Sequence, residues 1–338
     1  MQALVVRDGW LKTTAELTVS ENVPVPTLKP GQVLVKVVAA GANFFDILMV
    51  QGKYQVKPPF PFTPGGEFAG VVVAAHPSVE LKQLAIGTAV MGCDKWGAYA
   101  EYIAVSAAQV VPKPAPLSFE EACGLTITYP TSYAGLVLRA NLQPGEYVLV
   151  HAAAGGVGLA AVQIAKLLGA HVIATVGSDE KAAVARAQGA DHTVNYRDPD
   201  WPARVKRLTP QGRGVDVVYD PVGLIDLSLK CTAWNGRLVV VGFAAGNIER
   251  LALNRVLVKN VAVVGLYWGA YLVHEPARVS EVWGALLPWF AQRKFRPVVY
   301  PQVFEGLAQV PAALDTIASR DSYGKVVVKV GTASGTHL

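Results

Sequence analysis

Residues 147–176, YVLVHAAAGGVGLAAVQIAKLLGAHVIATV, have the pattern of a strand, a tight turn, a helix and a second strand. Tyr147 to His151 is short, apolar and β-branched, and Val172 to Val176 has the same character, which is typical of buried strands. Between them, Leu159 to Leu168 carries apolar residues at helical spacing, and Gly169 ends the predicted helix. The stretch is therefore predicted to be one βαβ unit.

The turn before the helix, Ala152 to Gly158, contains only small residues. Against the dinucleotide pattern G-x-G-x-x-G, Ala153 takes the first glycine position, and Gly155 and Gly158 take the other two. Such a turn lets the backbone approach a pyrophosphate, and the helix N-terminus offers unpaired N–H groups to it. A packing turn without a ligand is the alternative, but the strand–turn–helix–strand order favours a dinucleotide site.

Composition limits the class of protein. The chain has 338 residues, of which 52% are hydrophobic and 16% charged, as expected for two globular domains. No apolar run approaches the roughly 20 residues of a membrane helix, and the first 20 residues do not resemble a signal peptide. The three cysteines are far apart, which argues against a disulfide framework and predicts a reducing, cytoplasmic setting. The net charge of +5 is scattered, so a nucleic-acid partner is not expected.

The pattern of predicted secondary structure changes near Ser118. Before it, short strands alternate with Pro and Gly turns, which predicts a separate β-rich domain. After it, helices and strands alternate, which predicts an α/β fold with a doubly wound parallel sheet. Two amphipathic helices, Ala277 to Phe295 and Leu307 to Ile317, are not needed by that sheet and are expected to return to the N-terminal domain.

The end of the second strand of the βαβ unit bears on the cofactor. NAD-preferring folds usually place an Asp or Glu there, whereas this chain has Val176, followed by Gly177 and Ser178. Ser178 can donate a hydrogen bond and Lys181 can supply a positive charge to a 2′-phosphate, although Lys181 could equally be solvated. Asp179 is better explained as a first-turn acid of the next helix. The pattern favours NADPH.

Several motifs together resemble one family. They are HAAAGGVGLAAVQIAK, ANFFDILMVQGKY, PFTPGGEFAG, GAYAEY and GKVVV. In this order they resemble the zinc-independent quinone oxidoreductases of the medium-chain dehydrogenase/reductase superfamily. The resemblance implies a GroES-like catalytic domain (1–124 and 269–338), a Rossmann domain (125–268), an active site in the cleft between them, and a homodimer.

The resemblance also implies roles for particular residues. Asn43 would face cofactor and substrate, Tyr54 would be an active-site tyrosine, and Thr128 would contact the nicotinamide end. The residues that bind the pyrophosphate would be Gly155, Gly156, Val157 and Gly158. Those around the adenosine phosphate would be Ser178, Lys181 and Tyr196. Those lining the nicotinamide pocket would be Phe243, Leu266, Tyr267 and Trp268.

The zinc ligands of the wider superfamily are replaced in this chain. Their places read Gly41-Ala42-Asn43, Gly66 before Glu67, and Thr126-Ile127-Thr128. A tetrahedral zinc site needs three protein ligands, and only Glu67 is left, so no metal is expected and Glu67 is interpreted as a structural acid. Alcohol oxidation is therefore disfavoured, because it needs a stabilised alkoxide.

A metal-free reaction suits an acceptor that is already electrophilic, such as a quinone or an α,β-unsaturated carbonyl. Hydride from NADPH would produce an oxyanion, with Asn43 and Tyr54 as candidate hydrogen-bond donors. Asn43 could instead be a helix N-cap, and Tyr54 could only pack on Pro58 and Pro59. Tyr267 and Trp268 could be plain core or interface residues.

Three functions stay open at this stage. They are an NADPH-dependent quinone oxidoreductase, an enone or enoyl-thioester (acyl-CoA) reductase, and an NADPH-binding structural or regulatory protein with little turnover. Lys53 and Lys57, which flank Tyr54, could serve a CoA ester or be solvated. The apolar strand Val261 to Gly265 could pair across a two-fold axis, so a homodimer is predicted.

Overall fold

The chain divides at two points in the computed structural model, which describes residues 1–80 and 84–332. Unit 1 contains Met1–Ile127 and Arg296–Leu338, and unit 2 contains Thr128–Phe295. The predicted catalytic segments 1–124 and 269–338 include residues 81–83 and 333–338, which lie outside the described residues.

Unit 1 is organised around two long antiparallel strands, β3 (Gln32–Gly41) and β4 (Glu67–Ala75), whose residues are mostly buried. Within the described residues seven strands form its sheet, in the order β14–β15–β3–β4–β5–β7, with β6 also paired to β3. The other strands are β5 (Ala89–Cys93), β6 (Tyr102–Ser106), β7 (Val110–Pro112), β14 (Phe304–Glu305) and β15 (Val327–Lys329). Because β15 pairs with β3, the late part of the chain completes the sheet that the early part begins.

Short helices cover this sheet, and a small strand pair lies beside it. The helices are α1 (Phe44–Val50), α2 (Phe119–Cys123) and α11 (Val310–Ala318), and the strand pair is β1 (Ala3–Leu4) with β2 (Val19–Ser20). The core between them is formed by fully buried side chains such as Phe68, Met49, Tyr99 and Phe304. The predicted separate β-rich domain is thereby confirmed.

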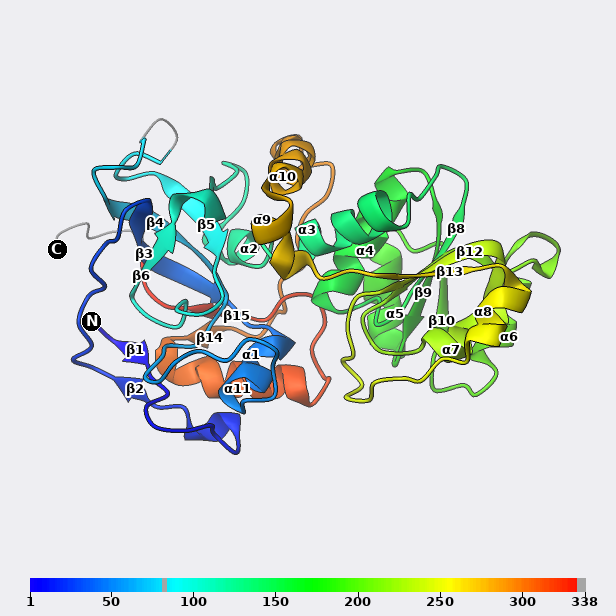
Figure 1. Cartoon of the computed structure of the whole chain (residues 1–338), viewed down its shortest axis with the longest axis horizontal. Coiled ribbons are helices and arrows are strands. Elements are labelled where there is room, and N and C mark those ends of the chain that lie inside the picture. The colour runs from blue at the N-terminus through cyan, green and yellow to red at the C-terminus, as the bar shows by residue number, and fades with distance from the viewer. Residues whose placement is uncertain (81–83, 333–338) are drawn as a thin grey trace. The chain divides into compact units, whose positions relative to one another are not determined.

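Unit 2, which lies wholly within the described residues, contains six parallel strands in the order β10–β9–β8–β11–β12–β13 (Figure 1). Their bounds are β8 (Tyr147–Val150), β9 (His171–Val176), β10 (His192–Asn195), β11 (Val215–Asp220), β12 (Thr232–Val240) and β13 (Ala262–Gly265). This is the predicted doubly wound Rossmann sheet. Because the strands are parallel, their carboxyl ends share one edge, where ligands bind in such folds.

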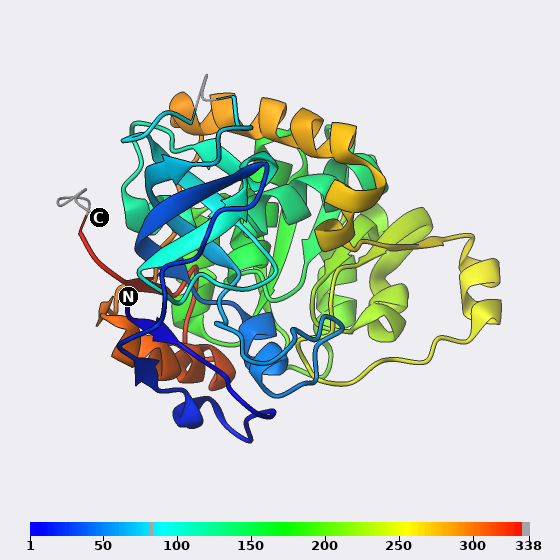
Figure 2. The same cartoon turned by 60° about the vertical axis from the view of Figure 1, so that its left-hand side comes forward.

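Helices α4 to α8 of unit 2 pack against this sheet, whereas α10 packs on α3 and α9 (Figure 1). The bounds of the unit 2 helices are α3 (Thr128–Tyr133), α4 (Gly156–Leu167), α5 (Asp179–Ala187), α6 (Trp201–Arg207), α7 (Ile225–Ser228), α8 (Leu253–Lys259), α9 (Tyr271–His274) and α10 (Pro276–Ala291). Figure 2 shows α8, in yellow, at the outer end of this unit. Three of its apolar side chains are largely exposed, namely Leu253, Leu257 and Val258.

Helix α10 belongs to unit 2, whereas the sequence interpretation expected it to return to the N-terminal domain. Aromatic rings hold it there, because Tyr129 of α3 lies with its ring centre 4.9 Å from that of Phe290 and 5.3 Å from that of Phe295. Helix α11 does return to unit 1, as expected. In residues 1–80 and 84–332 no helix is both long and apolar enough to cross a membrane.

Candidate functional site

The glycine turn leaves the start of α4 open. Gly155 is the N-cap, and Gly155, Gly156 and Val157 are all partly exposed. A Cβ at Gly158 would lie 2.2 Å from the carbonyl oxygen of Ala152, so no other residue fits there without moving the backbone. The first N–H groups of a helix have no partner within the helix. The Gly158 contact lets the start of α4 pack closely on the turn, and the partly exposed Gly155, Gly156 and Val157 leave backbone N–H groups there that suit a pyrophosphate.

The predicted adenosine-phosphate residues lie together at the ends of β9 and β10. Ser178 is the N-cap of α5, and its Oγ accepts a hydrogen bond from the backbone N–H of Lys181 at 3.3 Å. The Tyr196 N–H bonds to the carbonyl oxygen of Val176 at 3.1 Å. A Cβ at Gly177 would lie 2.5 Å from the Tyr196 hydroxyl, so the tyrosine ring packs directly on this glycine. No acid ends β9, and Asp179 lies in the first turn of α5.

The predicted nicotinamide-side residues follow the ends of β12 and β13 and differ in exposure. Phe243 (39% exposed) lies beside Gly223, and Tyr267 is 54% exposed. Leu266 is buried, and Trp268 stacks on Tyr271 with ring centres 5.1 Å apart. The predicted Thr128 is also buried, at the start of α3. Phe243 and Tyr267 are therefore the most exposed members of this group, and Trp268 is partly exposed.

In unit 1, Asn43 begins α1 directly after β3. Its backbone N–H donates to Asp46 Oδ2 at 2.9 Å, so the N-cap interpretation of Asn43 describes its backbone correctly. Its side chain has other partners. Nδ2 donates to the Gly41 carbonyl oxygen and to Glu67 Oε2, both at 3.2 Å, and Oδ1 accepts from Lys325 Nζ at 2.5 Å. Asn43 is thus both a cap and part of a buried side-chain network.

Glu67 and Lys325 form a buried ion pair beside Asn43. Glu67 Oε2 lies 2.5 Å from Lys325 Nζ, and their side chains are 0% and 6% exposed. The other oxygen, Oε1, accepts from the Ile127 N–H at 2.8 Å and from the Thr126 hydroxyl at 3.2 Å. The structural interpretation of Glu67 agrees with these contacts. The sequence analysis did not predict a role for Lys325. The one signal in the sequence is that Lys325 is a single charged residue directly before the apolar run Val326 to Val328.

Asp46 lies next to this network with one oxygen unpaired. Oδ2 accepts from the Tyr99 hydroxyl at 2.8 Å, whereas Oδ1 is buried and has no hydrogen-bond partner among the described residues. Burial raises the pKa of Asp46 to about 7, against the hydrogen bonds from Tyr99 and Asn43, which lower it. A proton on this carboxyl group therefore persists to near-neutral pH.

The predicted catalytic Tyr54 lies in unit 1 and is partly buried. Its ring stacks on Phe45 with centres 5.4 Å apart and packs against the core of that unit. The flanking Lys53 and Lys57 are exposed. Its contacts therefore include apolar packing, as the alternative interpretation anticipated, although the partner is Phe45.

His151, which follows β8, is a structural residue. Its Nδ1 and Nε2 lie 2.8 Å from the hydroxyls of Thr175 and Ser228. Ser228 donates its own proton to the Leu224 carbonyl oxygen, so Nε2 must carry the hydrogen and Nδ1 must accept one from Thr175. Burial lowers the pKa of His151, so the ring is neutral, and both of its nitrogens are paired.

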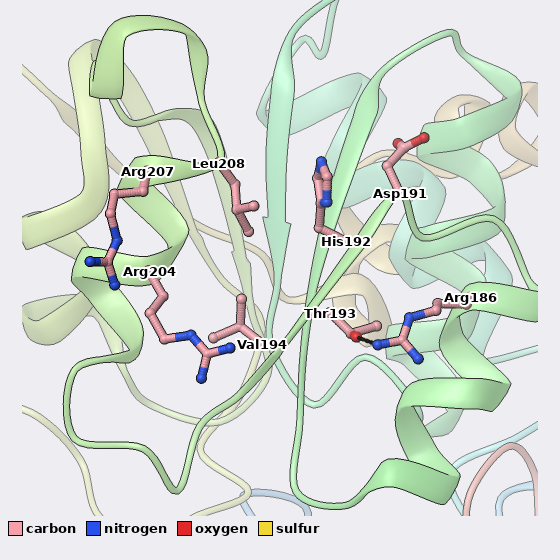
Figure 3. Close-up of a pocket in the computed structure, with 8 residues that line it drawn as sticks. All are labelled: Arg186, Asp191, His192, Thr193, Val194, Arg204, Arg207 and Leu208. Atoms are coloured by element: carbon pink, nitrogen blue, oxygen red, sulfur yellow. Dashed lines mark hydrogen bonds between the residues drawn. The ribbon is translucent and has the colours of Figure 1, made fainter.

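A hollow of about 320 Å³ lies elsewhere in unit 2 (Figure 3). Three arginines line it, Arg186, Arg204 and Arg207, together with the start of β10. Two of them are already paired, Arg204 with Asp198 and Arg186 with the Thr193 hydroxyl. Helices α5 and α6 end here and β10 begins here, so the hollow is on the opposite sheet edge from the glycine turn.

Comparisons with known proteins decide the family. Residues 156–292 match the family described as zinc-binding dehydrogenase, and residues 29–115 match the alcohol dehydrogenase GroES-like domain. Quinone oxidoreductase-like protein 2 homolog of Nematostella vectensis is 40% identical over 92% of this chain and 85% of its own length. The chain belongs to the quinone oxidoreductase-like group of the medium-chain dehydrogenase/reductase superfamily. The resemblance inferred from the motifs is thereby confirmed.

Solved structures of this superfamily agree. The quinone oxidoreductase of Thermus thermophilus, also solved as its NADPH complex, is 36% identical with a TM-score of 0.83, over 98% of this chain and all of that one. The Escherichia coli quinone oxidoreductase, complexed with NADPH, is 29% identical with a TM-score of 0.87, over 97% of this chain and all of that one.

The zinc implied by the matching family description does not fit the donors present. Among the described residues no group of three or more His, Cys, Asp or Glu side chains could hold a metal ion. Glu67 is the acid left at the superfamily's ligand positions, and its oxygens are taken by Lys325, Asn43, Thr126 and Ile127. A cation is already present there, as the ammonium of Lys325.

Proposed function

We propose that this member of the group is an NADPH-dependent, zinc-independent quinone oxidoreductase. The observation that carries the proposal is the combination of a partly exposed glycine turn at the start of α4 with an acid-free strand end at β9. The first suits a pyrophosphate, and the second avoids repelling a 2′-phosphate. NADPH in two solved relatives supports the same cofactor.

The cofactor would be held by residues at the carboxyl edge of the unit 2 sheet. Backbone N–H groups of Gly156, Val157 and Gly158 would bind the pyrophosphate, and Ser178 with Lys181 would bind the 2′-phosphate. Tyr196 would pack on the adenosine, and Phe243 with Tyr267 would contact the nicotinamide end. Bound NADPH would supply the hydride.

The acceptor chemistry depends on residues of unit 1. A quinone that takes up hydride and one proton becomes a hydroquinone, and negative charge develops on its oxygen during transfer. Asn43 Nδ2 would donate a hydrogen bond to that oxygen, and Tyr54 would donate a hydrogen bond or the proton. No metal ion is required for this step, because a quinone is already electrophilic.

The test is the oxidation of NADPH and of NADH with four acceptors, each in the presence of a chelator. The acceptors are 1,4-benzoquinone, 9,10-phenanthrenequinone, an open-chain enone and crotonyl-CoA. We expect NADPH-linked turnover of the quinones that the chelator does not change. Turnover of the enone or thioester alone would replace the proposal with double-bond reduction, and binding without turnover would favour a binding protein.

Lys181 provides a matched test of the cofactor. Lys181→Ala should raise the Kd for NADPH about tenfold through the loss of one charge-assisted hydrogen bond, and leave the Kd for NADH unchanged. Arg186→Ala, near the other end of α5, serves as the control and should change neither Kd. Equal weakening of both cofactors by Lys181→Ala would contradict the assigned role.

A further inference from the structure

The Lys325 ammonium has no part in the reaction as proposed so far. Its Nζ lies 2.5 Å from Glu67 Oε2 and 2.5 Å from Asn43 Oδ1. Removing two charges from water costs free energy that their attraction often only balances, so a buried ion pair is weak evidence of a purely stabilising role. Its contact with Asn43 points to a second role.

Lys325 and Glu67 together fix which way the Asn43 amide faces. An ammonium can only donate, so it must meet Oδ1, whereas the Glu67 carboxylate and the Gly41 carbonyl can only accept, so they must meet Nδ2. Turning the amide by 180° would place a donor against a donor and an acceptor against two acceptors. One orientation is therefore selected.

The lysine stem is held along its length by two glycines. A Cβ at Gly124 would lie 2.4 Å from Lys325 Cγ, and one at Gly41 would lie 2.9 Å from Cε. The lysine is only 5% exposed, so its ammonium cannot reach solvent unless the side chain moves away from Gly41 and Gly124. The positive charge is thus fixed in place.

A fixed cation on the amide oxygen also affects the amide nitrogen. It draws electron density toward Oδ1, and hydrogen bonds that share one polar group strengthen one another. Both existing hydrogen bonds from Nδ2 are long, at 3.2 Å against the usual length of about 2.9–3.0 Å. The acceptor oxygen that becomes negative during hydride transfer can therefore displace the Gly41 carbonyl from Nδ2.

We propose that Lys325 is a positioning residue that orients and polarises the Asn43 amide, so that Nδ2 donates to the oxygen that becomes negative in the acceptor. The inference rests on the proposed role of Asn43 in quinone reduction. In this chain a side-chain ammonium therefore acts on the acceptor oxygen through an amide.

The activity test uses Lys325→Met, which keeps the length of the stem and removes the charge. We expect kcat with 1,4-benzoquinone to fall 10- to 100-fold, while the Kd for NADPH stays unchanged. Lys329→Met is the control, at a partly exposed lysine of β15 outside this network, and should keep the wild-type kcat. Adding Lys325→Met to Asn43→Ala should cause no further loss, and additive losses would overturn the proposal.

A second variant covers the case in which the unpaired Glu67 prevents folding. Glu67→Gln with Lys325→Met removes both charges and leaves the cluster neutral. This variant should fold with a cooperative melt and still show the reduced kcat. Wild-type kcat in the folded double variant would overturn the proposal.

A spectroscopic readout separates this inference from the proposed function. With selective ¹⁵N-asparagine labelling, the Asn43 side-chain NH₂ signal is assigned by its loss in Asn43→Ala. It should lie downfield and exchange slowly in the wild type, and move to ordinary asparagine values in the neutral double variant. An unchanged signal defeats the role of Lys325, whereas a wild type that reduces no acceptor defeats the proposed function.

Discussion

At the scale of single residues, Asp46 connects burial to pH. Its pKa is raised to about 7 by burial, from an ordinary value of 3.8. The folded state therefore holds the Asp46 proton more tightly than the unfolded state does. The contribution of this proton to the free energy of unfolding is complete below pH 3.8 and is lost as the pH rises through about 7.

Asp46→Asn should therefore flatten the pH dependence of stability. The free energy of unfolding of the variant, relative to the wild type, should rise from pH 4 to pH 8 by about 4 kcal/mol, since one pKa unit corresponds to about 1.4 kcal/mol. Urea unfolding at several pH values measures this difference. The exposed Asp8→Asn is the control, and parallel curves for Asp46→Asn and wild type would contradict the expectation.

Residue-level prediction succeeded where partners are near in sequence. A helix N-cap was the alternative interpretation of Asn43, because asparagine favours that position, and the structure places Asn43 there with Asp46 as a partner one turn away. Lys325 was missed because it is 282 residues from Asn43, and no spacing rule joins positions so far apart. The sequence therefore indicated the helix start in this polar cluster and did not indicate the contact with Lys325.

At the scale of elements, the start of α4 is the feature most open to direct test. Gly158→Ala would place a Cβ 2.2 Å from the Ala152 carbonyl oxygen. The turn must shift to accept it, so NADPH binding should weaken by at least tenfold, and the Tm should fall by several degrees. Titration of NADPH fluorescence and a thermal melt measure the two effects.

The matched control for that variant is Gly284→Ala in α10. Among the described residues no neighbouring atom lies within 4 Å of a Cβ built at Gly284, so this variant should bind NADPH normally. Normal binding by Gly158→Ala would show that the turn does not hold the cofactor.

The βαβ unit was predictable because a strand, turn and helix follow one another within 30 residues and each has a local signature. The unit to which α10 belongs could not be predicted in this way. Its apolar stripe predicted a buried face, but not whether Phe290 would meet the rings of Tyr129 and Phe295 or a surface of the other domain. Periodicity identifies the face of a helix and does not identify what covers it.

At the scale of the whole molecule, unit 2 has a sheet edge at β13. Within the part of the chain that the structure describes, this strand pairs only with β12, and Leu266 N–H points back to Val240, so the backbone groups of Val263 face outward. Helix α8, which directly precedes β13 in the chain, carries the exposed Leu257 and Val258. Edges of this kind are usually covered, and a second copy of the chain would cover this one.

We therefore expect a homodimer that pairs through β13. Leu257→Glu and Val263→Pro should each weaken the dimer by at least tenfold in Kd, measured by sedimentation equilibrium. Ile86→Glu, an exposed apolar position of unit 1, is the control. A wild-type chain that sediments as a monomer at micromolar concentration would rule out this expectation.

The pairing of β15 with β3 also has a consequence for how the protein is made. All of unit 2 emerges from the ribosome before β15 does, so the Rossmann unit can fold while the sheet of unit 1 still lacks its late strands. During that interval Asn43 and Glu67 have no lysine to pair with. The nascent chain therefore carries an incomplete sheet edge and an uncompensated carboxylate until residues 325–329 arrive, which makes this the stage at which a chaperone would matter most.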